Sequence, residues 1–213
     1  QDQLLDESLP ITWRHINKLA GCGALGDLGS HLLSISQFIM GDITKVNAVA
    51  TTVFPKRPKS AGSTEMVDVE NEDIMTFMAE YANGAIGQIA CSRVATGRKN
   101  YLTYEIQGTK GSVRYDLERM GEVQVYFQSD NERDRGFRTV LLNPLMKGYS
   151  AFQPAGGISI AYNDMKILEV HALFDAITNG ADYVTDFEFG YKIDRTVAAV
   201  IESSKTHEWV DVK

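Results

Sequence analysis

Apolar residues recur three and four positions apart in three segments of the chain, a spacing that is typical of amphipathic helices. These predicted helices cover residues 26–40, 165–178 and 191–205. The first is followed directly by Gly41 and the second by Asn179-Gly180. Glycine just past the last turn is a common helix stop, so these glycines mark the C-terminal ends of the two helices.

Between the first two helices, β-branched and aromatic residues alternate with polar ones, which indicates strands. The clearest pair, 73–81 and 85–94, flanks the strong hairpin signal Asn83-Gly84. The other predicted strands are 44–54, 101–107, 112–117, 123–128, 138–142 and 209–212. Segments 55–64 and 143–163 are predicted as loops. This order predicts one α+β domain over residues 1–213, with helices on one face of a large, mainly antiparallel sheet and the other face open.

Composition is ordinary for a globular domain and excludes several classes of function. The chain is 44% hydrophobic and 23% charged, with a net charge of −7. A negative chain lacks the basic face of nucleic-acid binders and of polybasic membrane contacts. No apolar run approaches the ~20 residues of a membrane span. Cys22 and Cys91 make no disulfide framework, so we predict a cytoplasmic protein without nucleic-acid or membrane partners.

The strongest candidate for chemistry is an acid and an imidazole beside a glycine-rich segment. Asp27 and His31 stand four residues apart at the start of the first predicted helix, so they share one face. The preceding Gly21–Gly26 lets another molecule approach the backbone closely. A carboxylate beside an imidazole suits proton transfer near neutral pH. The residues alone leave open that Asp27 only caps the helix and that His31 is a partly buried structural histidine.

The same glycines spell G-x-G-x-x-G, the fingerprint of dinucleotide-binding loops, and Asp42 follows further along. That fingerprint requires a buried apolar strand directly before the first glycine, whereas residues 13–20 are mixed and charged. We therefore predict that these glycines bind no dinucleotide. Asp27 and His31 would supply two metal ligands where a catalytic zinc usually has three, so no metal is predicted.

Several segments, in this order, resemble the C-terminal domain of the glucose–fructose oxidoreductase, inositol dehydrogenase and rhizopine catabolism (Gfo/Idh/MocA) family. They are Trp13-Arg14, Gly21–Gly26, Asp27–His31, Ser92–Asn100, Gly108–Ser112, Gly136–Thr139 and Trp209–Val212. The resemblance covers essentially the whole chain. It implies a two-domain enzyme whose N-terminal Rossmann domain binds NAD or NADP and is absent from this chain. The fragment is then a substrate-binding and oligomerisation domain, inactive alone, whose open sheet face forms a homodimer or homotetramer.

The resemblance also implies the reaction, which is hydride transfer between a sugar or polyol (inositol-like) hydroxyl carbon and nicotinamide. His31 is the expected general acid/base, and Asp27 its helper. The expected substrate-binding residues are Trp13, Arg14, Ser34, Arg93, Arg98, Tyr162 and Asn163. All of these except Ser34 also have a structural interpretation: Trp13 as a core residue, Arg14 as part of a surface ion pair, Arg93 and Arg98 as solvated charges, and Tyr162 and Asn163 as anchors of a loop.

Ser34 stands where the family often has an aspartate. The substrate preference of this protein is therefore expected to differ from that of inositol-type members. The alternative function is a non-catalytic ligand-sensing or interaction protein of the same fold.

Overall fold

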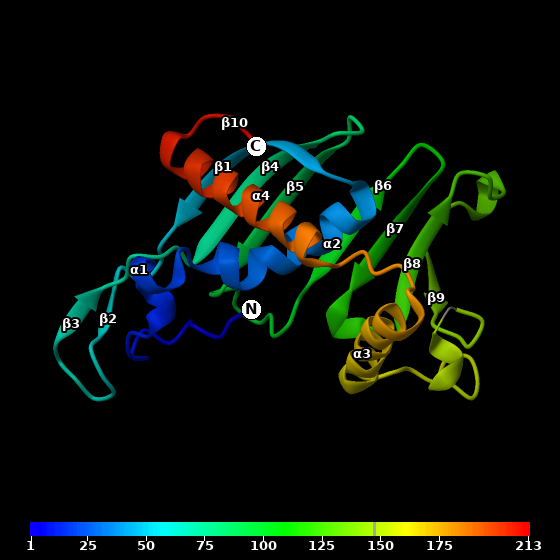
Figure 1. Cartoon of the computed structure of the whole chain (residues 1–213), viewed down its shortest axis with the longest axis horizontal. Helices are drawn as coiled ribbons and strands as arrows, with labels where there is room; N and C mark the ends of the chain where they lie inside the picture. Colours follow the sequence, from blue (N-terminus) through cyan, green and yellow to red (C-terminus); the bar gives the residue numbers. More distant parts are fainter. Residues whose placement is uncertain (147) are drawn as a thin grey trace. The chain divides into compact units, whose positions relative to one another are not determined.

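The chain folds into two compact units, and its described strands pair antiparallel throughout. The computed structural model describes residues 1–146 and 148–213. The first unit comprises Gln1–Lys99 with Thr185–Lys213, and the second comprises Asn100–Val184 (Figure 1). The α+β class is confirmed, although the described strands form sheets of four, two and four strands instead of one large sheet.

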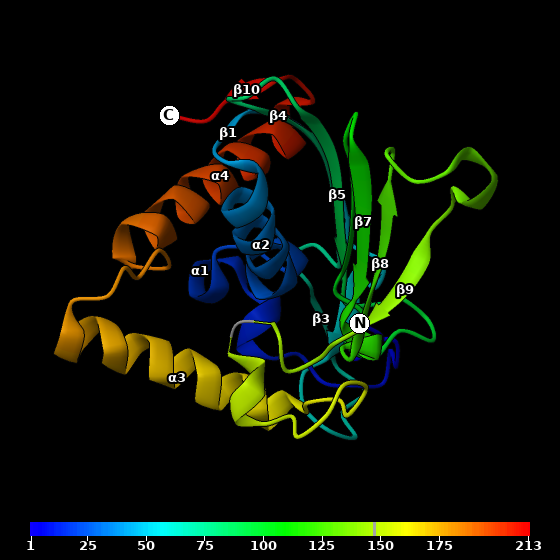
Figure 2. The same ribbon diagram turned by 90° about the vertical axis from the view of Figure 1, so that its right-hand side faces the viewer.

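The first unit is built around a four-stranded sheet in the order β10-β1-β4-β5. Two helices, α2 and α4, lie on the same face of this sheet (Figures 1 and 2). The bounds of these elements are β1 (Ile43–Thr51), β4 (Ile74–Tyr81), β5 (Ile86–Ser92), β10 (Val210–Asp211), α2 (Ser30–Met40) and α4 (Phe187–Thr206). The helices therefore cover one face of the sheet, as the order of elements predicts.

Alternation along the strands decides which side chains the helices cover, because successive strand residues point to opposite faces. In β4, Met75 and Phe77 are buried, and both pack in one core with Leu33 of α2 and Val200 of α4. A hydrogen bond fixes α4 on β1, since the backbone N–H of Ala48 donates to the Ser203 hydroxyl over 2.9 Å.

The opposite face of this sheet exposes apolar side chains on three adjacent strands. Val49 of β1, Met78 of β4 and Ile86 of β5 are 57%, 50% and 79% exposed. Polar residues stand between them, since Met78 pairs with Asn47 and Gln88 and Ile86 pairs with Glu80, so this face is a mixed surface with exposed apolar side chains.

Short helical turns and a hairpin complete the first unit. Residues 55–64, predicted as a loop, contain a strand that pairs with residues 66–68, so that prediction was wrong. Proline and lysine obscured the strand pattern. The buried Arg57 stabilises the strand by donating to the carbonyls of Leu4 (2.6 Å) and Asp6 (2.8 Å). The elements are η1 (Trp13–His15), α1 (Asn17–Ala20), η2 (Leu25–Gly29), β2 (Lys56–Pro58) and β3 (Met66–Asp68).

The second unit is an antiparallel meander, β6-β7-β8-β9, followed by α3. Helix α3 begins at Tyr162 and ends at Asn179, slightly longer at both ends than predicted. No helix of the described residues combines the length and apolar composition that crossing a bilayer requires. The remaining elements are β6 (Thr103–Gln107), β7 (Gly111–Asp116), η3 (Leu117–Arg119), β8 (Glu122–Phe127), η4 (Glu132–Asp134), β9 (Arg138–Leu141) and η5 (Tyr149–Ala151).

Candidate active site

A cavity of about 270 Å³ lies in the first unit, where the glycine-rich segment leads into η2. Five of the predicted site residues share its wall, although they come from three separate stretches of sequence. An apolar cavity of about 150 Å³ holds benzene, so this one has room for a single six-membered ring with substituents. The lining residues are Trp13, Arg14, Ala20, Cys22, Gly23, Gly26, Asp27, Ser30, His31 and Arg93.

The carboxylate of Glu72, which sequence reasoning missed, holds the glycine-rich segment in place. Its two oxygens accept hydrogen bonds from the backbone N–H groups of Gly23 and Leu25, both at 2.9 Å. The backbone carbonyl of Glu72 accepts a third, from Ala24 at 3.0 Å. Glu72 therefore caps η2, the role that the structural interpretation gave to Asp27. A Cβ at position 23 would lie 2.0 Å from the Glu72 carbonyl oxygen, so only glycine fits there.

The first predicted helix is not regular at its start. Residues Leu25–Gly29 form a π-helical turn, and the α-helix begins only at Ser30. The backbone N–H of Ser30 donates to the carbonyl of Leu25, five residues back. The prediction of a helix over residues 26–40 is confirmed in extent, since helical residues run from Leu25 to Met40, but apolar spacing alone does not distinguish a π-helical first turn from an α-helical one.

Asp27 faces Arg14 rather than His31. Its Oδ2 atom lies 3.8 Å from Nε of Arg14 and 3.5 Å from Nε2 of Gln3. Among the described residues, no hydrogen bond or ion pair joins Asp27 to His31, whose side chain is exposed at the cavity. The pair with Arg14 is partly exposed, so it contributes little to stability and leaves the carboxylate able to accept a ligand's hydrogen bond.

Trp13 is not a core residue, contrary to its structural interpretation. Its side chain is 54% exposed, and the Arg14 guanidinium lies 4.5 Å from the centre of its ring. A cation over an indole face is a favourable contact that orders both side chains. The ring therefore presents a flat apolar surface at the cavity wall.

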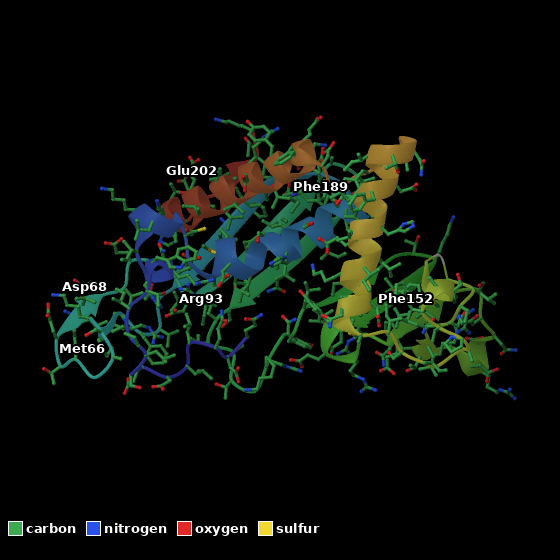
Figure 3. The ribbon with its side chains drawn as sticks, turned by 60° about the horizontal axis from the view of Figure 1, so that its bottom comes forward. Met66, Asp68, Arg93, Phe152, Phe189 and Glu202 are labelled. Carbon is green, nitrogen blue, oxygen red and sulfur yellow. The ribbon has the colours of Figure 1, made fainter. Side chains whose placement is uncertain are left out.

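Arg93 directly follows β5 and is fully buried, which rules out a solvated surface charge (Figure 3). Its Nη2 atom donates to the carbonyl of Glu72 at 2.9 Å and lies 3.4 Å from Oδ1 of the buried Asp73. Its Nε and Nη1 atoms have no hydrogen-bond partner within the part of the chain that the structure describes. Because buried donors are normally paired, this guanidinium is suited to donate to a bound ligand.

His15 lies beneath this region and is also buried. Desolvation lowers its pKa, and the positive charges of Arg93 and Arg57 lower it further. Its Nδ1 atom accepts a hydrogen bond of 3.0 Å from the backbone N–H of Thr12, which a neutral imidazole can do. His15 is therefore a structural histidine with a neutral ring.

The depressed pKa of His15 predicts a stability that falls in mild acid. Above its unfolded pKa of about 6.5, the ring is neutral in both states. Below that pH the imidazole of His15 becomes protonated in the unfolded chain but stays neutral in the folded chain. The free energy of unfolding therefore falls, by at most about 1.4 kcal/mol per pH unit, until the pH passes the lowered folded pKa.

Urea denaturation between pH 7.5 and 5.5 measures this slope. His15→Asn keeps an acceptor for Thr12 and is expected to flatten it, whereas the exposed control His207→Asn keeps the wild-type slope. Equal slopes for His15→Asn and wild type would contradict the assignment.

The remaining predicted residues are not brought to this cavity. Ser34 on α2 and Arg98 after β5 are absent from its lining. Tyr162 and Asn163 begin α3 in the second unit, and their roles stay predictions.

Cys22 lines the cavity, but burial raises the pKa of its thiol, which argues against a thiolate nucleophile. Among the described residues, no group of three His, Cys, Asp or Glu side chains is arranged for a metal.

Comparison with known proteins places this geometry in a family. Residues 2–114 match the sequence model described as the GFO/IDH/MocA C-terminal domain. The whole chain is 38% identical to levoglucosan dehydrogenase of Pseudarthrobacter phenanthrenivorans, over 57% of that enzyme. Solved structures of levoglucosan dehydrogenase superpose on this chain, and the matched region covers all of this chain and 56% of the levoglucosan dehydrogenase chain. The TM-scores are 0.95 for the complex with NADH and L-sorbose and 0.93 for that with NADH and levoglucosan, each at 38% identity. The chain therefore spans little more than half the length of these relatives.

Proposed function

The chain belongs to the GFO/IDH/MocA oxidoreductase family as its C-terminal domain, and from that premise we propose that it forms the substrate-binding half of a sugar dehydrogenase. The observation that carries this proposal is the cavity in which Asp27, His31, Trp13, Arg14 and Arg93 meet. NAD is the expected cofactor, because the superposed relatives were solved with NADH.

The glycine-rich segment of this chain does not fit a dinucleotide. A phosphate at the start of η2 would need free backbone N–H groups, and the Glu72 carboxylate already accepts those of Gly23 and Leu25. The segment before the first glycine is the short helix α1, not a strand. We therefore assign the cofactor to an N-terminal domain and expect the isolated chain to be inactive.

His31 is the proposed general base for the substrate hydroxyl. Oxidation of a carbinol transfers its hydride to nicotinamide, so the hydroxyl proton must pass to a base in the same step. The imidazole of His31 is exposed at the cavity, and imidazole is the side chain most often used to accept or donate a proton near neutral pH. Asp27 is proposed to accept a hydrogen bond from a substrate hydroxyl, because its ion-pair and hydrogen-bond partners among the described residues are Arg14 and Gln3 and do not include the imidazole.

The other lining residues are proposed to bind an uncharged monosaccharide. The Trp13 ring offers an apolar face to the C–H side of a sugar, and the free N–H groups of Arg93 donate to its oxygens. The charges in the cavity are balanced, since Arg14 faces Asp27 and Arg93 faces Asp73. A balanced cavity favours a neutral sugar over a sugar acid or a sugar phosphate, whose extra charge would remain unpaired.

The test is a substrate screen on the full-length protein. Neutral sugars, including levoglucosan and L-sorbose, are incubated with NAD⁺ or NADP⁺, and reduction of the nicotinamide is followed by absorbance. We expect turnover with at least one neutral monosaccharide and preference for NAD⁺. Ligand binding without turnover in any combination would instead favour a sensing protein.

The uncovered sheet face of the first unit is proposed to pair with a second copy of the chain. Ile86 is 79% exposed there, so Ile86→Glu would place a charge on the proposed contact face. We expect sedimentation velocity to show a smaller species for Ile86→Glu than for wild type. Thr109→Glu, on an exposed turn of the second unit, is the control that should change nothing. An unchanged assembly for Ile86→Glu would show that this face is not the interface.

A further inference from the structure

The π-helical turn η2 lies between the two groups of the proposed acid–base site. Asp27 is inside the turn, and His31 follows it in the first turn of α2. In a regular α-helix each residue advances about 100°, which would set these side chains about 40° apart around the axis. A π turn holds more residues per turn, so each residue advances less and the angle between the two side chains changes. The turn therefore decides where the imidazole lies relative to the carboxylate.

The Ser30 hydroxyl contacts the carbonyl that, in this π-helical turn, has lost the backbone N–H of residue 30 as its donor. In an α-helix the backbone N–H of Ser30 would donate to the carbonyl of Gly26, but here that N–H donates to Leu25. The Ser30 hydroxyl donates to the Gly26 carbonyl instead, at 2.8 Å. Serine hydroxyls that bond to a carbonyl one turn back compete with the backbone and bend helices.

The rest of the turn is fixed from the other side by packing. Leu25 is fully buried, and Gly29 lies so close that a Cβ there would be 2.9 Å from the Leu25 side chain and 3.2 Å from the sulfur of Cys91. The N-terminal end is held by Glu72. The core thus fixes the buried side of η2, whereas the Ser30 hydroxyl acts on the side that lines the cavity.

We propose that Ser30 is a positioning residue, whose hydroxyl bond to Gly26 holds the π-helical turn and thereby sets the direction of His31 relative to Asp27. This inference rests on the proposed dehydrogenase function. The hydroxyl's only proton is committed to the Gly26 carbonyl, so Ser30 acts through the backbone and not by donating to substrate. A misplacement of a reacting group by about 1 Å costs on the order of 10²-fold in rate, so a small rotation is enough to matter.

The experiment compares Ser30→Ala with Ser30→Thr in the full-length enzyme. Ser30→Ala is expected to lower kcat by about 10- to 100-fold with KM within threefold of wild type. Ser30→Thr retains a hydroxyl that can bond to the same carbonyl and is expected to restore kcat to within threefold. If Ser30→Ala does not fold, Ser30→Cys, which keeps the size but donates weakly, takes its place. Thr178→Ala removes a hydroxyl that donates to the Phe174 carbonyl, also four residues back, at 2.7 Å in the regular helix α3, and is the matched control.

A double variant separates positioning from a general structural effect. In a His31→Ala background, Ser30→Ala should cause no further loss of kcat, because it acts through the missing imidazole. A wild-type kcat for Ser30→Ala, a loss confined to KM, or an equal further loss in the double variant would overturn the inference. If His31→Ala itself retains wild-type kcat, the proposed base is wrong. If His31→Ala is inactive and Ser30→Ala is normal, only the role of Ser30 fails.

Discussion

On the proposed dehydrogenase function, replacing His31 by alanine in the full-length protein is expected to lower kcat by about 10²–10⁴-fold, the usual contribution of a positioned acid–base group. The imidazole is exposed at the cavity and is not committed to Asp27, so it is available to take the hydroxyl proton. Without it, the proton must pass to water. Stopped-flow and steady-state absorbance of the nicotinamide measure the loss.

The affinity for NADH should remain within a few-fold of wild type in the same variant. The reason is that the Glu72 carboxylate accepts the N–H groups of Gly23 and Leu25 in the segment next to His31, so we expect this segment to contribute no phosphate contact to NADH. The control is His207→Asn, because His207 ends α4 with a φ of 59°, a conformation that asparagine tolerates. Wild-type turnover in His31→Ala would remove the general-base role, and lost NADH binding would place His31 at the cofactor instead.

The second large effect is expected on stability, from Arg93→Met. The change leaves the Asp73 carboxylate buried without the cation that lies 3.4 Å away. Removing one partner of a buried pair typically costs about 3–5 kcal/mol, because the remaining charge is uncompensated. Chemical denaturation of the isolated chain measures this loss and needs neither cofactor nor substrate.

Adding Asp73→Asn tests the origin of that loss. Asparagine can still accept the backbone N–H groups of Val53 and Phe54, which now donate to Asp73 at 2.8 and 3.2 Å, but it carries no charge. We expect the double variant to be more stable than Arg93→Met alone, since the unpaired charge is gone. A loss below about 1 kcal/mol in Arg93→Met, or a double variant that is less stable still, would contradict the buried ion pair.

Sequence pattern predicted the elements that depend on local spacing. The Asn83-Gly84 signal lies at the turn between β4 and β5, where Gly84 has a φ of 85° and Tyr81 pairs with Ala85. Helix α4 begins at Phe187, four residues earlier than predicted, because the Asp186 carboxylate accepts the backbone N–H of Phe189 and caps it. The capping residue was present in the sequence, but the apolar period starts later.

Contacts between distant residues could not be predicted from one sequence. Glu72 reaches Gly23 across 49 positions, and nothing in its neighbours signals that its carboxylate caps a helix. The buried Arg93 looked like part of an exposed charge cluster with Arg98, because local composition does not reveal which side chain turns inward. The meeting of Arg93 with Asp27 and His31 at one cavity is a property of the fold, which places the end of β5 beside η2.

The exposed Trp13 gives the chain a built-in optical reporter. Only Trp13 and Trp209 absorb and emit as indoles in this chain, and Trp13 alone lines the cavity. A sugar that covers its ring would exclude water from the indole and shift its emission to shorter wavelength. In a Trp209→Phe background, fluorescence titration of the isolated chain would then report sugar affinity directly, separately from the cofactor and from any chemical step.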